Sequence, residues 1–136
     1  MSTTVLAAPP GSRSGTWSRV GLVLAATMSM FNIVNGAGSL IDPSFGQLDP
    51  DTPAQPVWMS LLLLGFGLAT LVAVVPAWRG SRRALWVVIV TRLLEAWSAV
   101  VLPFLPGAPE GLWVAVVGLI VLGTTVAGLV ALGLRR

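Results

Sequence analysis

A charged pair in the middle of an apolar segment constrains this chain more than any other feature. Residues 84–105 are apolar enough and long enough to cross a bilayer, which takes about 20 residues, and Arg92 and Glu95 lie near their centre. On insertion scales each central charge costs about 2.5–3.5 kcal/mol. The twelve Leu, Ile, Val and Phe residues of the segment return roughly 4–7 kcal/mol together. The segment therefore needs neighbouring helices or an internal ion pair.

The spacing of the pair predicts a polar stripe along this helix. Arg92 and Glu95 are three residues apart, so they share a helix face. At about 100° per residue, Thr91 and Ser98 fall in the same arc as Glu95, with Arg92 at its edge. The two tryptophans of the segment fall on the opposite side. We expect the polar stripe to face the other helices and the tryptophans to face lipid.

The composition excludes most classes of protein and most kinds of chemistry. The chain has 136 residues, of which 55% are hydrophobic and 10% charged, whereas soluble domains average about 25% charged residues. Cys and His are both absent, which removes disulfides, Fe–S clusters, the commonest metal ligand and the commonest general base. No serine or threonine has a partner base that would make it a nucleophile. We expect no enzymatic activity, no metal and no cofactor.

Four apolar segments of spanning length follow one another along the chain. They predict an all-α integral membrane protein, a four-helix transmembrane bundle formed by a single domain over residues 19–136. The polar tail at residues 1–18 has no apolar period, and we expect it to be disordered and cytoplasmic. The expected spans are residues 20–41, 57–78, 84–105 and 112–134.

A cleaved secretory signal is the alternative interpretation of the first segment. Arg13 and Arg19 precede its apolar core, as they would in a signal peptide. Against this, the segment is long enough to span and carries Asn32 and Asn35 inside it. We therefore favour a retained span.

The arginines predict the orientation of the bundle. In a four-span arrangement all the flanking arginines lie on one side, and Asp42, Asp49, Asp51 and Glu110 lie on the other. The positive-inside rule then places both termini in the cytoplasm. The net charge of +3 therefore indicates topology and not nucleic-acid binding. Richness in Arg, Ala, Gly, Val and Pro is typical of high-GC bacteria and points to a bacterial inner membrane. The flanking arginines are Arg13, Arg19, Arg79, Arg82, Arg83, Arg135 and Arg136.

Counting depth along the helices predicts a central layer of polar side chains. At 1.5 Å per residue, Asn32 and Glu95 both come roughly 18–19 Å from the cytoplasmic end. Arg92 lies about 13 Å from that end, and Thr70 and Thr124 about 12–16 Å. All four helices are thus expected to contribute to the layer. The candidate cluster consists of these residues and their polar neighbours on the same faces: Arg92, Glu95, Asn32, Asn35, Thr70, Thr91, Ser98 and Thr124.

The cluster has two interpretations. Ionisable groups inside a membrane mark ligand sites or ion paths by default. A buried network that only fixes helix register is the other interpretation, and it is the one that the sequence favours. In that network Arg92 and Glu95 form an ion pair, with Glu95 ionised at neutral pH.

Several segments resemble small bacterial four-span proteins of the DoxX-like kind. They are the Asn32–Gly36 segment, the Leu40–Pro43 helix exit, the Trp78–Gly80 turn and the Arg92–Glu95 core. The resemblance implies a four-helix bundle in the inner membrane and little about chemistry. Small four-span drug exporters are the other comparison, but their essential glutamate lies in the first span, where this chain has asparagines.

The sequence therefore predicts an accessory or small-ligand-binding membrane protein that is not an enzyme. Its polar site would be centred on Arg92, Glu95, Asn32 and Asn35. A proton-coupled small-molecule transporter using Glu95 is the alternative, and a lipid- or quinone-linked enzyme comes third because His and Cys are missing. Expected partners are the lipid bilayer, a small hydrophobic ligand, and further copies of the chain or a larger membrane complex.

Overall fold

In the part of the chain that the structure describes, all regular structure is helical. The computed structural model describes residues 13–45, 54–104, 108 and 111–135. Its elements are α1 (Arg13–Ile41), α2 (Val57–Trp78), α3 (Arg82–Ser98), the 3₁₀ helix η1 (Ala99–Phe104), α4 (Leu112–Ala131) and the 3₁₀ helix η2 (Leu132–Arg135).

Four stretches of these helices are long and apolar enough to cross a membrane, and they confirm the predicted helical class. The second predicted span, residues 57–78, coincides with α2 at both ends. The four stretches are Gly15–Ile41, Val57–Trp78, Arg82–Phe104 and Leu112–Arg135.

The first helix begins earlier than the sequence predicted. Residues 13–18, assigned to a disordered tail, form the first turns of α1, and the rest of that tail lies outside the described residues. The reason is packing, which apolar periodicity did not reveal. These turns lie against η2 and the end of α4, where buried Ser18 donates a hydrogen bond from Oγ to Val130 O at 3.5 Å.

The third span is not one continuous α-helix. The α-helical hydrogen bonding of α3 ends at Ser98, and the chain continues as the 3₁₀ helix η1, which contains Pro103. Proline has no backbone N–H, so it cannot donate to the carbonyl of Ala99 one turn earlier. The last six described residues of this span are therefore wound more tightly than the sequence predicted.

The turn between α2 and α3 is closed by backbone hydrogen bonds and one side-chain cap. Gly80 adopts a φ of 91°, which glycine tolerates because it has no Cβ. Its N–H donates to Ala77 O at 3.0 Å, and Ser81 N donates to Pro76 O at 3.0 Å. The Ser81 hydroxyl then accepts from Ala84 N at 3.4 Å and caps α3.

The opposite end of the bundle is marked by an acidic turn after α1. The Ser44 hydroxyl donates to Asp42 Oδ1 at 2.6 Å and Ser44 N donates to it at 2.9 Å. These two hydrogen bonds stabilise the carboxylate and lower the pKa of exposed Asp42.

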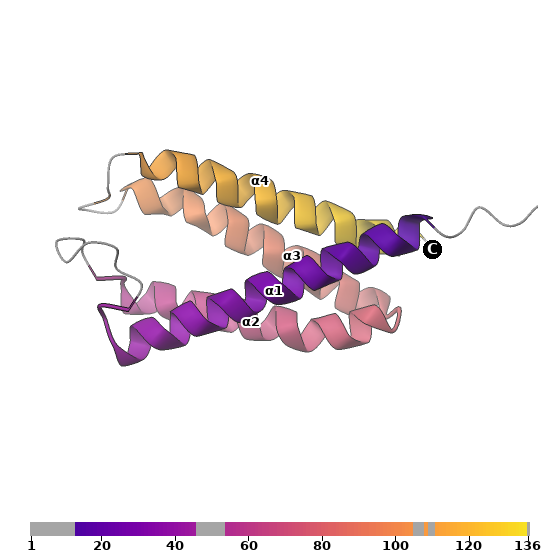
Figure 1. The fold of residues 1–136 in the computed structure, drawn as a ribbon, viewed down its shortest axis with the longest axis horizontal. Coiled ribbons are helices and arrows are strands. Elements are labelled where there is room, and N and C mark those ends of the chain that lie inside the picture. Colours follow the sequence, from indigo (N-terminus) through magenta and orange to yellow (C-terminus); the bar gives the residue numbers. More distant parts are fainter. Residues whose placement is uncertain (1–12, 46–53, 105–107, 109–110, 136) are drawn as a thin grey trace, which may run out of the picture.

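Two antiparallel hairpins, α1–α2 and α3–α4, make up the bundle (Figure 1). Figure 1 shows them converging at the end where the described chain begins and finishes, and separating at the other end. α2 also packs against α3, and α1 against α4. The buried apolar core lies in the convergent half. It contains Leu22, Ala25, Ala73, Ala77, Ala84, Leu85, Val88, Ile89, Val126, Ala127 and Val130.

Glycines set the closest helix approaches, as is common in membrane bundles. A Cβ built on Gly36 would lie 2.7 Å from Ser60 O, and one on Gly67 would lie 2.9 Å from Ser29 O, so both glycines bring α1 and α2 together. On Gly123 it would lie 2.6 Å from the Cβ of Ala96, between α4 and α3.

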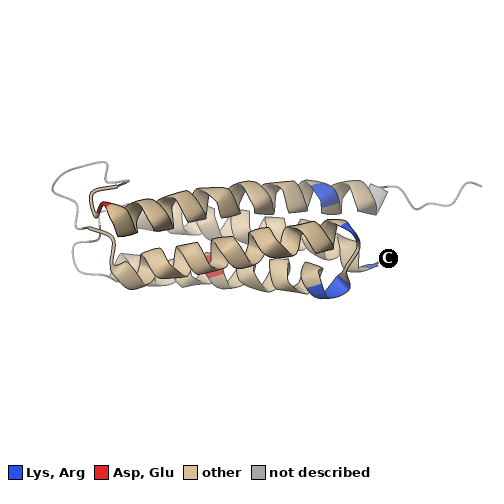
Figure 2. Ribbon diagram, turned by 90° about the horizontal axis from the view of Figure 1, so that it is seen from below, with Lys and Arg blue, Asp and Glu red and all other residues tan. Residues whose placement is uncertain are grey.

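The surface carries its charge at the ends and its aromatic rings around the sides. Figure 2 shows basic residues gathered at the end where the described chain begins and finishes. Arg19 lies over the ring of Trp78, 5.7 Å from its centroid. All six tryptophans are 47–61% exposed, including Trp86 and Trp97. The predicted outward-facing side of α3 is therefore confirmed.

The glycine contacts predict opposite effects from two neighbouring substitutions in α2. Gly67→Ala places a methyl group against backbone and the Ile33 side chain, so it should lower the free energy of unfolding by about 1–3 kcal/mol. Gly65→Ala meets nothing within 4 Å and should raise it by about 0.5–1 kcal/mol. Unfolding in detergent, followed by tryptophan fluorescence, measures both. Equal effects would contradict the close approach of α1 and α2 at Gly67.

Candidate functional site

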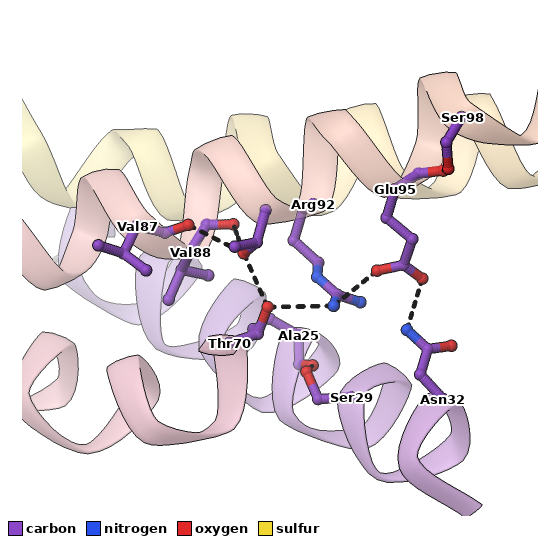
Figure 3. Close-up of polar contacts among 10 residues, drawn as sticks. Ala25, Ser29, Asn32, Thr70, Val87, Val88, Arg92, Glu95 and Ser98 are labelled. Carbon is purple, nitrogen blue, oxygen red and sulfur yellow. Dashed lines mark hydrogen bonds and ion pairs between the residues drawn. The ribbon is translucent and has the colours of Figure 1, made fainter. Parts of the chain in front are cut away.

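Polar side chains from three helices meet midway along the bundle (Figure 3). Arg92 extends from α3 into the interior and is 1% exposed. It is the largest fully buried side chain among the described residues. Asn32 of α1 and Thr70 of α2 are also buried. The site therefore lies between helices, and not on one of them.

The Arg92–Glu95 ion pair is the centre of this site. Arg92 Nη2 lies 2.6 Å from Glu95 Oε2, across one turn of α3. From α1, Asn32 Nδ2 donates to the other carboxylate oxygen, Oε1, at 2.6 Å. The carboxylate is thus held from two helices, and the predicted common level of Asn32 and Glu95 is confirmed.

A chain of hydrogen bonds continues from the guanidinium into α2 and back to α3. Arg92 Nη2 donates to Thr70 Oγ1 at 3.1 Å, and Thr70 Oγ1 lies 2.7 Å from Thr91 Oγ1. Thr91 uses its single hydroxyl proton toward the carbonyl oxygens of Val87 and Val88, at 2.9 and 3.1 Å. Thr70 must therefore donate to Thr91, because each hydroxyl has only one proton to give.

Part of the guanidinium has no partner within the chain. Among the described residues, Arg92 Nε and Nη1 are buried without a hydrogen-bond partner. Glu95 Oε2 is also buried without one, apart from its ion pair with Arg92 Nη2. Nε and Nη1 carry three of the five N–H groups of an arginine. A buried donor left unsatisfied costs about 1–3 kcal/mol. A network that served only to hold the helices together would therefore be incomplete here, because these buried donors lack acceptors.

A pocket of about 570 Å³ lies against the charged pair, in the half of the bundle where the hairpins separate. Its polar lining comes mainly from Arg92, Glu95 and Asn32 at the inner end and from Asn35, Gln55 and Ser98 farther out. The rest of the wall is apolar apart from Thr27. It comprises Thr27, Met28, Phe31, Trp58, Met59, Leu62, Leu63, Phe66, Ala96, Ala99, Leu102, Leu119, Leu122 and Gly123.

The pocket reaches the lateral surface of the bundle. Phe31 of α1 lines it and is 70% exposed, and Leu119 and Leu122 of α4 line it and are 43% and 46% exposed. Trp58 and Leu62 of α2 also line it and are 48% and 42% exposed. The pocket therefore reaches the apolar side surface of the bundle, in the half where the two hairpins separate (Figure 1).

Two predicted site residues line the pocket without joining the ion-pair network. Asn35 Nδ2 donates to Phe31 O of its own helix at 2.9 Å, and Ser98 Oγ donates to Glu95 O at 2.8 Å. Each is satisfied locally by the backbone, so neither holds the guanidinium. Both contribute polarity to the outer part of the pocket.

Thr124 corrects the prediction that all four helices supply the polar layer. It is exposed on α4 and belongs neither to the network nor to the pocket lining. The helical rise predicts its depth, but depth does not fix which face a residue occupies. α4 turns Gly123, Val126 and Ala127 inward instead, and Thr124 falls about 60–160° away from them around the helix.

Sequence reasoning missed the apolar wall of the site. Trp58, near the start of α2, lines the pocket, as do its neighbour Met59 and, two turns deeper, Phe66. Gln55, just before α2, also lines it and donates from Nε2 to Ser60 Oγ at 3.2 Å. The i, i+1, i+4, i+8 spacing of Trp58, Met59, Leu62 and Phe66 was visible as one helix face.

No relative supplies an identity for this arrangement. Comparison of the chain with known protein families, curated proteins and solved structures finds no match. Within the described ranges, no three His, Cys, Asp or Glu side chains lie together in a way that could hold a metal ion. The ion pair and the pocket beside it are therefore the features that bear on function.

The pair predicts an unequal effect of its two single substitutions. Glu95→Leu leaves a buried guanidinium that stays protonated at any accessible pH, so it should lower the free energy of unfolding by about 3–5 kcal/mol. Arg92→Leu should lower the free energy of unfolding by less, because Glu95 is partly exposed to the pocket and can take up a proton. Thermal unfolding in detergent compares the two.

The double variant Arg92→Leu/Glu95→Leu is the control for this prediction. It removes both charges together, so it should recover most of the stability lost in Glu95→Leu. A double variant as unstable as Glu95→Leu would show that the two side chains do not compensate each other.

Proposed function

We propose that this chain is a multi-pass integral membrane protein that binds a small, largely apolar molecule in the pocket beside Arg92 and Glu95. The observation that carries the proposal is the pocket itself. Ligand sites are typically concave, of about 300–1,000 Å³, mostly apolar and furnished with a few convergent polar groups. The 570 Å³ space, with its apolar wall and its polar inner end, has each of these properties.

The pocket favours ligand binding over a network that only fixes register. A register-fixing network should satisfy its own members and be closed by packing. Here two guanidinium nitrogens have no partner in the part of the chain that the structure describes, and the pair borders an open space and not a packed core. The convergent half of the same bundle shows that this chain can pack tightly where nothing has to be admitted.

A lateral opening supports delivery of the ligand through the lipid phase. The side wall of the pocket is lined by exposed apolar residues such as Phe31 and Leu122, which in a bilayer would face acyl chains. A mostly apolar molecule dissolved in the membrane would meet this opening without crossing water. The function is that of an accessory or carrier protein, and no catalytic step is proposed.

The same proposal includes a bacterial inner membrane and cytoplasmic termini, as in the DoxX-like proteins that the sequence resembles. Arg19, Arg79 and Arg135 support it because they mark one end of the bundle, while exposed Asp42 lies at the other. By the positive-inside rule, a difference of this kind favours a cytoplasmic basic end.

Cysteine labelling in intact cells tests this orientation. The chain has no native cysteine, so cysteines placed at Ser44 and Ala108 should react with an impermeant thiol reagent added outside. Cysteines at Ser14 and Ser81 should react only after the cells are opened. The reversed pattern would place the arginines outside and refute the orientation.

A pocket-filling substitution tests the binding function. Leu63 lines the pocket, so Leu63→Trp should abolish displaceable binding of apolar probes, whereas Val72→Trp on the same helix should not. Val72 is 73% exposed and lies outside the pocket lining, which makes it a matched control for the added bulk. Suitable probes are four radiolabelled dodecyl compounds: methyl laurate, laurate, dodecylamine and dodecene.

Binding is measured by scintillation proximity on purified protein in nanodiscs, as the signal displaced by excess unlabelled probe. At least one probe should show such binding to the unsubstituted chain. If none does, or if Leu63→Trp and Val72→Trp behave alike, the pocket is not a ligand site.

A further inference from the structure

We infer that the ligand is electrically neutral and carries a hydrogen-bond acceptor, of carbonyl type, at the end that meets Arg92. This inference rests on the proposed function and specifies the class of molecule that the pocket takes. Three properties of the pocket carry it: its net charge, its unpartnered hydrogen-bond donors and its apolar wall.

The charges of the lining favour a neutral ligand. Among the described residues that line the pocket, Arg92 and Glu95 are the only ionisable ones, and they compensate each other at 2.6 Å. A ligand anion would leave one uncompensated negative charge in an apolar enclosure, and a ligand cation one positive charge. Both are costly away from water.

The unpartnered atoms of the guanidinium favour an acceptor. Among the described residues, Arg92 Nε and Nη1 are buried donors with no acceptor within reach, while Nη2 is already engaged by Glu95 and Thr70. Figure 3 shows the guanidinium between Thr70 and Asn32, and Arg92 and Asn32 both line the pocket. Both nitrogens are buried from a water-sized probe in this conformation. A ketone, ester or amide oxygen would therefore satisfy them, without adding a charge, after a shift of the side chains that cover them.

The wall specifies the rest of the molecule. Beyond the polar inner end, the pocket is bounded by leucine, methionine and aromatic side chains from α1, α2, η1 and α4. These fit a hydrocarbon chain or ring system that follows the carbonyl toward the opening beside Phe31. The ester of a bilayer glycerolipid and the carbonyl of a free single-chain molecule share this chemistry.

The four dodecyl probes separate the head-group requirement from binding itself, because they differ mainly at one end. With displaceable binding measured at pH 9, where laurate is ionised and dodecylamine largely protonated, methyl laurate should bind most tightly. Its advantage over dodecene should be about tenfold or more, the worth of a hydrogen bond to a charged group. Laurate and dodecylamine should bind more weakly than methyl laurate.

Glu95→Gln tests the inference because it should reverse the order in which laurate and methyl laurate bind. The substitution keeps the side-chain shape and an oxygen for Asn32, but it leaves the pocket with the single positive charge of Arg92. Laurate should then bind more tightly than methyl laurate and should raise the Tm of this variant. A side chain that mattered only for structure would weaken all four probes alike.

Arg92→Lys supplies an independent test that keeps the charge of the pair. A lysine ammonium can serve Glu95 and Thr70, but it lacks the additional planar donors of the guanidinium. The ratio of the affinity for methyl laurate to the affinity for dodecene should therefore fall toward one, while dodecene still binds. An unchanged advantage would overturn the role given to Nε and Nη1.

The outcomes distinguish this inference from the proposed function. If no probe shows displaceable binding, the proposed function fails. If probes bind but laurate or dodecylamine leads in the unsubstituted chain, or dodecene equals methyl laurate, the site binds ligands and the inference alone is overturned.

Dilauroylglycerol, added as a competitor of methyl laurate, identifies the source of the carbonyl. Effective competition assigns the site to a glycerolipid. Exclusion of the two-chain molecule assigns it to a free single-chain ligand. Both results presuppose a neutral carbonyl at Arg92 and support the inference.

Discussion

The structure depends on compensating one charge that cannot be removed. A guanidinium remains protonated in proteins, so Arg92, at 1% exposure, must find its partners inside the bundle. Glu95 supplies the counter-charge from the same helix, while Thr70 and Asn32 connect the pair to α2 and α1. These contacts fix the relative height of three helices, because a shift of one residue along any of them would separate atoms now 2.6–3.1 Å apart. The segment that inserts least readily by itself thereby specifies how the others align.

The two halves of the bundle are packed differently, although the same helices run through both. In the convergent half, glycine and alanine let backbones approach, and the apolar core is closed. In the other half the hairpins stay tight internally, through Gly36 in one and Gly123 in the other, but they separate from each other. The pocket is therefore a consequence of the angle between two rigid hairpins, and the ion pair lies where closed packing gives way to open space.

The sequence predicted the helices and the level of the polar residues, but not the faces of all of them or the space between them. Hydropathy located α2 at both ends, and the helical rise placed Asn32 beside Glu95 correctly. Thr124 was misplaced because rise gives height alone, and in α4 the neighbouring Gly123 takes the inward position that close packing requires. The first turns of α1 were missed because contacts with η2 stabilise them, and those contacts are distant in sequence. The pocket could not be predicted, since no local pattern encodes the angle between hairpins.

Register alone does not explain why this position carries an ionised pair. Neutral side chains such as asparagine can fix register in a membrane bundle at lower insertion cost, and Asn32 already links α1 to α3. An arginine and a glutamate together add something that neutral residues lack, namely charged hydrogen-bonding groups in a site with no net charge. Part of that capacity is spent on Thr70 and Asn32, and part is left unpartnered beside the pocket. Under the proposed function, the cost of burying the pair is the cost of holding strong donors at mid-depth in an apolar environment, where they would recognise a neutral molecule that arrives through the lipid.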